Sequence, residues 1–169
     1  MAPRTVLITG ANRGIGFGIT KNLLSVEGIE IVIAACRSPK NAEELKKITN
    51  SKLHIVQLDI TNDASIQKAV GEVEKIVGER GLNLLINNAG VITPYGLNST
   101  PSRSALFEQF DINISSVIIN TQYFLPLIKK APSDRRIINI SSLLGSIGSN
   151  TWGSKSNNVN PTMAYSVSK

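Results

Sequence analysis

The sequence predicts an α/β fold in which a doubly wound parallel sheet is covered by helices on both faces. Five short apolar, β-branched runs alternate with longer segments of helical pattern along the 169 residues. Most of these runs are almost continuously apolar, which is typical of strands buried on both faces of a parallel sheet. Strands that alternate with helices require right-handed crossovers, and these place helices on both faces. The length is that of one domain, so we treat residues 1–169 as a single unit.

The expected elements follow in chain order from these runs and from local capping signals. The five expected strands are residues 5–9, 30–35, 53–58, 82–87 and 136–141. The four expected helices are residues 14–26, 39–49, 62–79 and 103–130. Asn62 or Asp63 can cap the third helix. Gly78 and Gly81 bracket the end of that helix. Pro126 should kink or finish the fourth helix, because proline lacks the N–H that a helix needs.

Composition excludes several classes of protein. The chain is 41% hydrophobic and 18% charged, which rules out a disordered tail, a collagen-like repeat and a disulfide-stapled mini-protein. Its single cysteine, Cys36, lies in an apolar stretch and is expected to be a small buried hydrophobe. Its single histidine, His54, lies in an expected strand and cannot build a metal site alone. No signal peptide and no membrane span is evident, so we expect a cytoplasmic protein without a membrane partner.

The charge balance is basic but dispersed. Eighteen Lys and Arg stand against twelve Asp and Glu, which gives a net charge of +6. The basic residues occur in short pairs, at 46–47, 129–130 and 135–136. Solvated helix faces and ends explain such pairs better than a nucleic-acid footprint, so we expect no nucleic-acid partner. A dinucleotide with an extra phosphate is a polyanion that this balance favours.

A glycine-rich loop follows the first expected strand, in the sequence TGANRGIG. Gly10 permits a tight turn, Gly14 lets the backbone approach a pyrophosphate, and Gly16 lets the next helix pack closely. The N–H groups at the start of that helix suit phosphate oxygens. The alternative is a plain strand–turn–helix with permissive glycines. The candidate dinucleotide-binding residues of this loop are Gly10, Asn12, Arg13, Gly14, Ile15 and Gly16.

The residues after the second and third strands favour NADPH over NADH. A site for NAD usually places an acid after the second strand to hold the ribose 2′-hydroxyl. This sequence has Arg37 there, and Arg37 with Arg13 could clamp a 2′-phosphate. The alternative is two solvated arginines. After the third strand, Asp59 and Ile60 are placed to contact the adenine end, and the alternative for Asp59 is a carboxylate that caps the nearby helix.

Together with four further motifs, this loop resembles the classical short-chain dehydrogenase/reductase family. The motifs are NNAG at 87–90, Asn113 in the long helix, the pair Ser141–Ser142 after the fifth strand, and Tyr165-x-x-x-Lys169. TGANRGIG, Arg37 and the segment INISSLLGSIGSN most resemble Sniffer-type carbonyl reductases. The resemblance implies a Rossmann-like sheet with strand order 3-2-1-4-5.

The resemblance also implies a catalytic role for four residues. Tyr165 would donate a proton to the carbonyl oxygen of the substrate, and Ser142 would polarise that oxygen. Lys169, four residues after Tyr165 and so on the same helix face, would lower the pKa of Tyr165 and hold the nicotinamide ribose. Asn113 would bind a relay water through its backbone. Tyr165 and Lys169 therefore also count as cofactor residues, with the motif residues Asn87, Ala89 and Gly90 holding backbone near the cofactor.

Two departures from the family shape the functional expectation. The family pattern continues well past Tyr-x-x-x-Lys, so we expect a domain that is incomplete at its C-terminus and lacks the later strands, with 136–141 as an apolar open edge. The Gly/Ser/Asn-rich stretch 145–161 predicts a long loop before Tyr165, which by analogy favours a monomer. We expect an NADPH-dependent oxidoreductase that reduces an aldehyde, ketone or quinone. The alternative is a catalytically inactive, truncated dinucleotide-binding module.

Overall fold

A five-stranded parallel sheet organises the chain, and its strand order is β3-β2-β1-β4-β5. The computed structural model describes residues 3–96, 99–149 and 162–169. The strands are β1 (Thr5–Thr9), β2 (Ile31–Cys36), β3 (Leu53–Gln57), β4 (Leu84–Asn87) and β5 (Arg136–Asn139). The helices are α1 (Gly14–Leu24), α2 (Glu43–Lys46), α3 (Asp63–Val77), α4 (Arg103–Phe110), α5 (Ser116–Lys130) and α6 (Met163–Ser168). The predicted fold class and strand order are confirmed.

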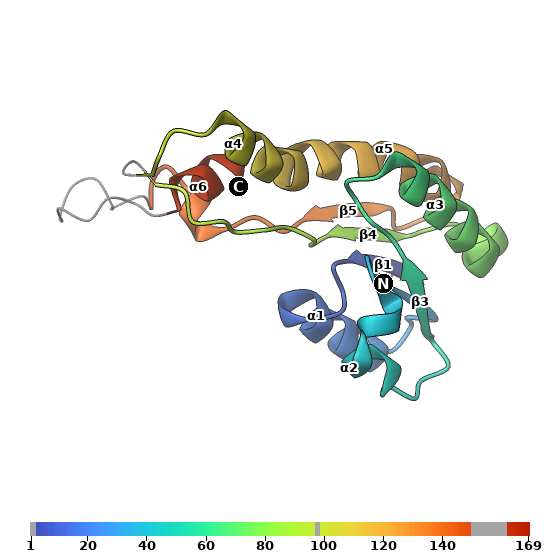
Figure 1. The fold of residues 1–169 in the computed structure, drawn as a ribbon. Coiled ribbons are helices and arrows are strands. Elements are labelled where there is room, and N and C mark those ends of the chain that lie inside the picture. Colours follow the sequence, from blue (N-terminus) through green and yellow to red (C-terminus); the bar gives the residue numbers. More distant parts are fainter. Residues whose placement is uncertain (1–2, 97–98, 150–161) are drawn as a thin grey trace.

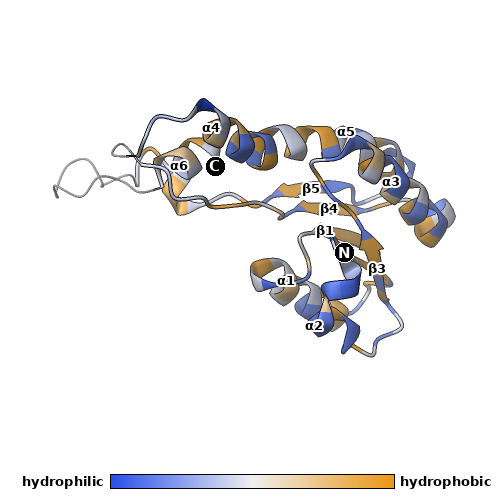
Figure 2. Cartoon of the chain, viewed as in Figure 1, coloured by the Kyte–Doolittle hydropathy of each residue, from blue (hydrophilic) through white to orange (hydrophobic). Residues whose placement is uncertain are grey.

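The two faces of the sheet bury separate apolar layers, as the alternation of side chains along a strand requires. Helices α1 and α2 cover one face, and α3 and α5 cover the other (Figure 1). Leu7 of β1 is fully buried with Phe124 of α5, while its neighbours Val6 and Ile8 are fully buried on the α1–α2 side. The apolar strands lie between helices whose outer faces are largely hydrophilic (Figure 2). This arrangement leaves the carboxyl ends of the strands and their loops as the place for a site.

The third helix follows the capping prediction closely. The side chain of Asn62 accepts a hydrogen bond from the backbone N–H of Ser65, which makes Asn62 the N-cap of α3. Gly78 and Gly81, after the helix, have φ angles of +57° and +64°, which glycine adopts without strain. The predicted end of this helix is therefore confirmed.

The helix predicted over 39–49 is much shorter than expected. A 3₁₀ turn, Pro39–Asn41, is followed by the single turn α2. Ala42, between them, has a ψ angle of +60°, which interrupts the helix. Ala42 and Leu45 are both buried against the sheet. Anchoring these two side chains in the core outweighs the helical pattern of the segment.

The long helix predicted over 103–130 is present but is not uniform. A π-helical stretch, Asp111–Ser115, joins α4 to α5. Pro126 neither finishes nor divides α5, which runs on to Lys130. Pro126 lies on the exposed side of the helix, where water can satisfy the carbonyl that loses its N–H partner. The prediction that Pro126 could end the helix is therefore wrong.

The fifth strand differs from the expectation of burial on both faces. All of β5 is exposed, with Ile137 and Ile138 keeping 40% and 41% of their surface. Within the described residues β5 lies at the edge of the sheet, paired only with β4. The apolar sequence of the strand thus predicted its place in the sheet, but not the degree to which it is covered. The apolar open edge expected at 136–141 is present.

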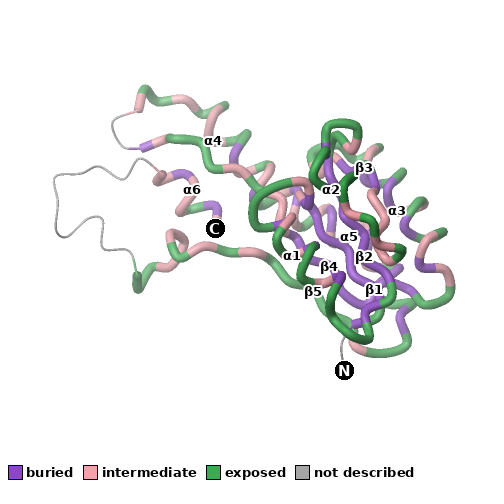
Figure 3. Tube along the Cα trace, turned by 90° about the horizontal axis from the view of Figure 1, so that it is seen from below, coloured by how far each residue is buried: buried purple, intermediate pink, exposed green. Residues whose placement is uncertain are grey.

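Burial decreases sharply from the sheet toward α4 and α6. The central strands and α5 are largely buried, whereas the end of the molecule that carries α4 and α6 is mostly half-buried or exposed (Figure 3). Residues 150–161, most of the predicted loop 145–161, lie outside the described residues. No helix in the described part of the chain is long and apolar enough to cross a membrane.

We predict that the thiol of Cys36 is inert in the folded protein. Its side chain is 2% exposed, and burial raises the pKa of the thiol, so little reactive thiolate forms at neutral pH. Titration with Ellman's reagent should be slow in native buffer and fast in guanidinium chloride. Equal rates in the two conditions would show that β2 is not held in the core as described.

Candidate active site

A cavity of about 780 Å³ lies at the carboxyl ends of the strands. Loops that follow all five strands contribute to its wall, together with α6, as expected for a ligand crevice in a doubly wound sheet. The predicted site residues that line it are Gly10, Asn12, Arg13, Gly14, Ile15, Gly16, Arg37, Asp59, Ile60, Ala89, Gly90, Ser142, Tyr165 and Lys169. Residues from both ends of the sequence thus meet in one cavity. Asn87 and Asn113 are the two predicted site residues that do not line it.

The glycine loop has the geometry that its predicted roles require. Gly10 has a φ of +66°, and a Cβ there would lie 2.9 Å from the Cα of Ala89. A Cβ at Gly16 would overlap the Gly10 carbonyl and the side chain of Asn88. Gly14 has a φ of +55° and faces open space, with nothing within 4 Å of where a Cβ would be. Gly10 and Gly16 therefore permit close packing, and Gly14 leaves room for a ligand.

Thr9 and Asn88 tie the loop after β1 to the loop after β4. The hydroxyl of Thr9 accepts hydrogen bonds of 3.0 Å from the backbone N–H groups of Asn88 and Ala89. The amide Nδ2 of Asn88 donates to the Thr9 carbonyl at 2.8 Å and to the Gly10 carbonyl at 3.3 Å. Sequence reasoning did not single out Asn88, although its position inside the NNAG motif was the available signal.

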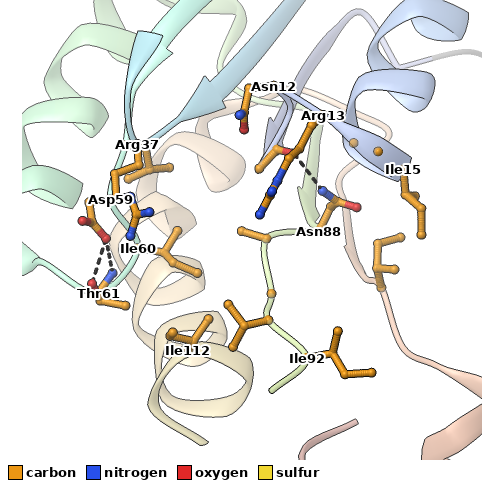
Figure 4. A pocket seen from close by; sticks show the side chains of 18 of the residues that line it. Asn12, Arg13, Ile15, Arg37, Asp59, Ile60, Thr61, Asn88, Ile92 and Ile112 are labelled. Carbon is orange, nitrogen blue, oxygen red and sulfur yellow. Dashed lines mark hydrogen bonds between the residues drawn. The ribbon is translucent and has the colours of Figure 1, made fainter. Parts of the chain in front are cut away.

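Two arginines face the cavity without partners of their own. Arg13 precedes α1, which begins at Gly14 with no side-chain cap, so the first N–H groups of that helix remain unpaired. Arg37 follows β2, at the position where a site for NAD usually has an acid. In the described part of the chain neither guanidinium makes a hydrogen bond or an ion pair, and both lie at the same end of the cavity (Figure 4). This end therefore combines two unpaired positive charges with free backbone N–H groups.

Asp59 and Ile60 line the cavity beside Arg37 (Figure 4). The carboxylate of Asp59 accepts hydrogen bonds from the backbone N–H of Thr61 at 3.1 Å and from its hydroxyl at 2.8 Å. These bonds form a local turn ahead of the α3 N-cap. The carboxylate of Asp59 does not cap α3, whose N-cap is Asn62, and Asp59 lines the cavity.

Tyr165 and Lys169 enter the same cavity from α6. Tyr165 is half-buried, and its pair Lys169 donates from Nζ to the carbonyl of Ile140 at 2.7 Å. Burial lowers the pKa of the Lys169 ammonium. The hydroxyl of Ser141 donates to the Lys169 carbonyl at 2.8 Å, whereas Ser142 accepts from the N–H of Leu144 at 3.2 Å. The Ser142 hydroxyl proton is therefore free for another acceptor, which fits the role predicted for Ser142 rather than Ser141.

Asn113 lies in the π-helical stretch and is 6% exposed. Its Oδ1 accepts from the N–H of Val91, and its Nδ2 donates to the Val91 carbonyl and to the Ser168 hydroxyl, each at 2.9 Å. The side chain is thus fully engaged, so a relay water at this residue would have to use the backbone. π-Helical turns disturb backbone pairing and often occur at functional sites.

Asn87, at the end of β4, is 4% exposed and forms a buried network. Its Nδ2 donates to Thr121 and Asn139, both at 2.9 Å, and its Oδ1 accepts from Asn120 at 2.8 Å. The side chain joins β4 to β5 and α5. Asn87 therefore holds the backbone at the end of β4, next to the cavity, without lining the cavity itself.

A comparison with protein-family models identifies the family to which these site residues belong. The family model described as short chain dehydrogenase matches residues 4–156. The chain belongs to the short-chain dehydrogenase family. The family resemblance found in the sequence is thus confirmed, and in this member of the short-chain dehydrogenases most of the motif residues line one cavity, with Asn87 and Asn113 outside its wall.

Solved structures of the family share the fold over the whole chain. The Sniffer carbonyl reductase of Caenorhabditis elegans is 44% identical, with a TM-score of 0.91 over 100% of this chain and 74% of that one. An NADPH-bound carbonyl reductase from chicken fatty liver is 37% identical, with a TM-score of 0.88 over 98% of this chain and 65% of that one. Among curated relatives, retinol dehydrogenase 16 of Mus musculus is 39% identical over 84% of this chain. The chain spans 44% of the length of that relative.

Two glycines of α1 should respond in opposite ways to alanine. Gly16→Ala places a methyl group against the Gly10 carbonyl, so we expect a loss of about 1–3 kcal/mol in the free energy of unfolding. Gly18→Ala, in the same helix, meets nothing within 4 Å and should stabilise the protein by about 0.5–1 kcal/mol. Urea denaturation measures both. A Gly16→Ala variant as stable as Gly18→Ala would contradict the close contact between the two loops.

Proposed function

We propose that this short-chain dehydrogenase uses NADPH to reduce the carbonyl group of an aldehyde, a ketone or a quinone. One observation carries the proposal: the same cavity is lined by two unpaired guanidinium groups, those of Arg13 and Arg37, and by the pair Tyr165 and Lys169. The first group of residues suits a phosphorylated dinucleotide, and the second suits proton transfer to an oxygen. The carbonyl reductases among the solved structures support this choice, one of them being bound to NADPH.

The cavity residues fit a dinucleotide with a 2′-phosphate. The open space at Gly14 and the unpaired N–H groups at the start of α1 would hold the pyrophosphate. Arg13 and Arg37 would hold the 2′-phosphate, because a guanidinium offers a planar fork of donors to such a group. Ile60 and Asp59 line the wall next to Arg37 and would border the adenine.

The chemistry follows from the groups that α6 and the loop after β5 bring together. NADPH, when bound, supplies the hydride that reduces the carbonyl carbon. The Ser142 hydroxyl would donate a hydrogen bond to the carbonyl oxygen and keep its proton, which fixes and polarises that oxygen. Tyr165 gives its phenolic proton to the same oxygen as negative charge develops there. The Lys169 ammonium, four residues along the same helix, stabilises the resulting phenolate and so favours the transfer.

A second candidate function is binding of the dinucleotide without turnover. The glycine loop and the two arginines suit a dinucleotide whether or not a carbonyl compound is reduced. The two candidates differ in one measurable property, because only the reductase oxidises NADPH in the presence of a carbonyl compound. We further propose a cytoplasmic monomer, and light scattering after gel filtration tests the oligomeric state.

Tyr165→Phe should abolish turnover without weakening cofactor binding. Loss of the phenolic proton removes the general acid, so we expect kcat with an aromatic aldehyde or a quinone to fall by a factor of about 10²–10⁴. Tyr123→Phe is the control, since the Tyr123 hydroxyl bonds to Gln67 on the outside of α3 and α5. NADPH should raise the melting temperature of the wild type, Tyr165→Phe and Tyr123→Phe by the same amount. Stabilisation by NADPH without turnover of the wild type would favour the binding module.

Arg37→Asp should reverse the preference for the phosphorylated cofactor. An acid at this position repels a 2′-phosphate and can accept from a 2′-hydroxyl, so we expect the NADPH dissociation constant to rise about 10–100-fold. Arg103→Asp, on the exposed first turn of α4, changes the net charge equally and serves as control. Isothermal titration with NADPH and NADH measures the ratio. An unchanged ratio would contradict the assignment of Arg37 to the 2′-phosphate.

A further inference from the structure

A segment of five residues, 91–95, connects the wall of the cavity to the helix that carries Tyr165. Val91 and Ile92 line the cavity at one end of this segment. At the other end, the Tyr95 carbonyl accepts a 3.3 Å hydrogen bond from the N–H of Ala164, the residue before Tyr165. Helices α4 and α6 lie side by side beyond the sheet, next to this segment (Figures 1 and 3).

The 91–95 segment is held at every second residue by side chains or backbone of neighbouring helices. Asn113 holds the N–H and carbonyl of Val91. One helical turn earlier, Gln109 accepts from the N–H of Thr93 with Oε1 at 2.7 Å. The bond from Ala164 to Tyr95 completes the series. No strand pairs with 91–95 within the described residues, so these bonds, together with the 2.8 Å bond from the Ser102 N–H to the Tyr95 hydroxyl, set its position.

Gln109 is an unusual residue to find in this place. Its side chain is 1% exposed, and its Nε2 has no hydrogen-bond partner in the described part of the chain. Burying an amide with unpaired N–H groups is unfavourable, and an apolar side chain of similar size would avoid the penalty. The single bond from Oε1 to Thr93 is therefore the contribution that a leucine or methionine could not make.

Hydrogen bonds attach both ends of α6, as described over Met163–Ser168, to neighbouring elements. Its start is attached to the 91–95 segment through Ala164, and its end to Asn113 through the Ser168 hydroxyl. Gln109 and Asn113, four residues apart on one helix, thus hold the two ends of α6, the first of them indirectly.

We propose that Gln109 is a positioning residue that sets the place of Tyr165 in the cavity through the 91–95 segment. The proposal rests on the proposed function, in which Tyr165 is the proton donor. Proton transfer requires heavy atoms within about 3 Å, and a misplacement of about 1 Å is costly to the rate. Gln109 does not line the cavity, so it acts through the segment and not by touching substrate or cofactor.

The test compares Gln109→Met with Gln122→Met in the full chain. The first variant keeps the length of the side chain and removes the acceptor of the Thr93 bond, while Gln122 is an exposed residue of α5. We expect Gln109→Met to speed amide exchange in 162–168 about fivefold relative to Gln122→Met, with α3 unchanged. We expect kcat to fall about tenfold, while the dissociation constant of NADPH stays within about twofold.

Two further variants keep the outcome clear. Gln109→Glu retains an acceptor oxygen, so at about pH 6, where burial favours the protonated carboxyl, it should restore most of kcat and the slow exchange of α6. Thr93→Pro removes the donor of the same bond from an exposed position, and it should reproduce Gln109→Met if that variant does not fold. Exchange in α6 that does not differ between Gln109→Met and Gln122→Met would overturn the proposal.

Failure of the proposed function gives a different result from failure of this inference. A wild-type chain that does not oxidise NADPH with any carbonyl compound would overturn the reductase, and the exchange measurement would still decide whether Gln109 holds α6. Turnover by the wild type with an unchanged kcat in Gln109→Met would overturn the positioning role and leave the reductase standing.

Discussion

The close contact between the loops after β1 and β4 is the constraint on which the site depends. Thr9 and Asn88 exchange hydrogen bonds across it, and Gly10 and Gly16 leave no room for a side chain at the crossing. Because β1 and β4 are neighbours in the sheet, this contact also lies where the strand order changes direction. A crevice opens at such a point in doubly wound sheets. The place that would receive the pyrophosphate thus follows from the sheet topology. Thr9, Gly10, Gly16 and Asn88 bring the two loops close together there.

Most of the sheet could be predicted from the sequence, because burial on both faces leaves a strong signal. The apolar runs of β1, β2 and β4 are fully buried, and their bounds differ from the expected ones by at most two residues. An equally apolar run forms β5, which lies exposed at the edge of the sheet, so the apolar run alone does not indicate how far a strand is covered. Hydrophobic sequence reports that a strand belongs in a sheet, whereas the cover over its faces depends on other parts of the chain.

The parts of the site that sequence reasoning missed are those whose role is to hold backbone. The roles proposed for Gly14, Arg37 and Tyr165 lie in the side chain or in its absence, so their residue type and spacing indicate those roles. The role proposed for Gln109 lies in one hydrogen bond, to the N–H of Thr93, and nothing in the neighbouring sequence indicates a buried amide. The π-helical stretch is hidden for a similar reason, because the segment around Asn113 has an ordinary helical composition.

Helix α6 shows how these two kinds of residue combine. It presents Tyr165 to the cavity, and Lys169, which follows the helix directly, lines the same cavity. Its position is set by bonds from three directions: from the loop after β5 through Ile140, from Asn113 through Ser168, and from the 91–95 segment through Ala164. These contacts are made by the Lys169 ammonium, the Ser168 hydroxyl and the Ala164 N–H, and the phenol of Tyr165 has no hydrogen bond within the described residues. The proton transfer proposed for Tyr165 would need that combination, because the helix must be held firmly while the reactive group stays free to bind the substrate oxygen.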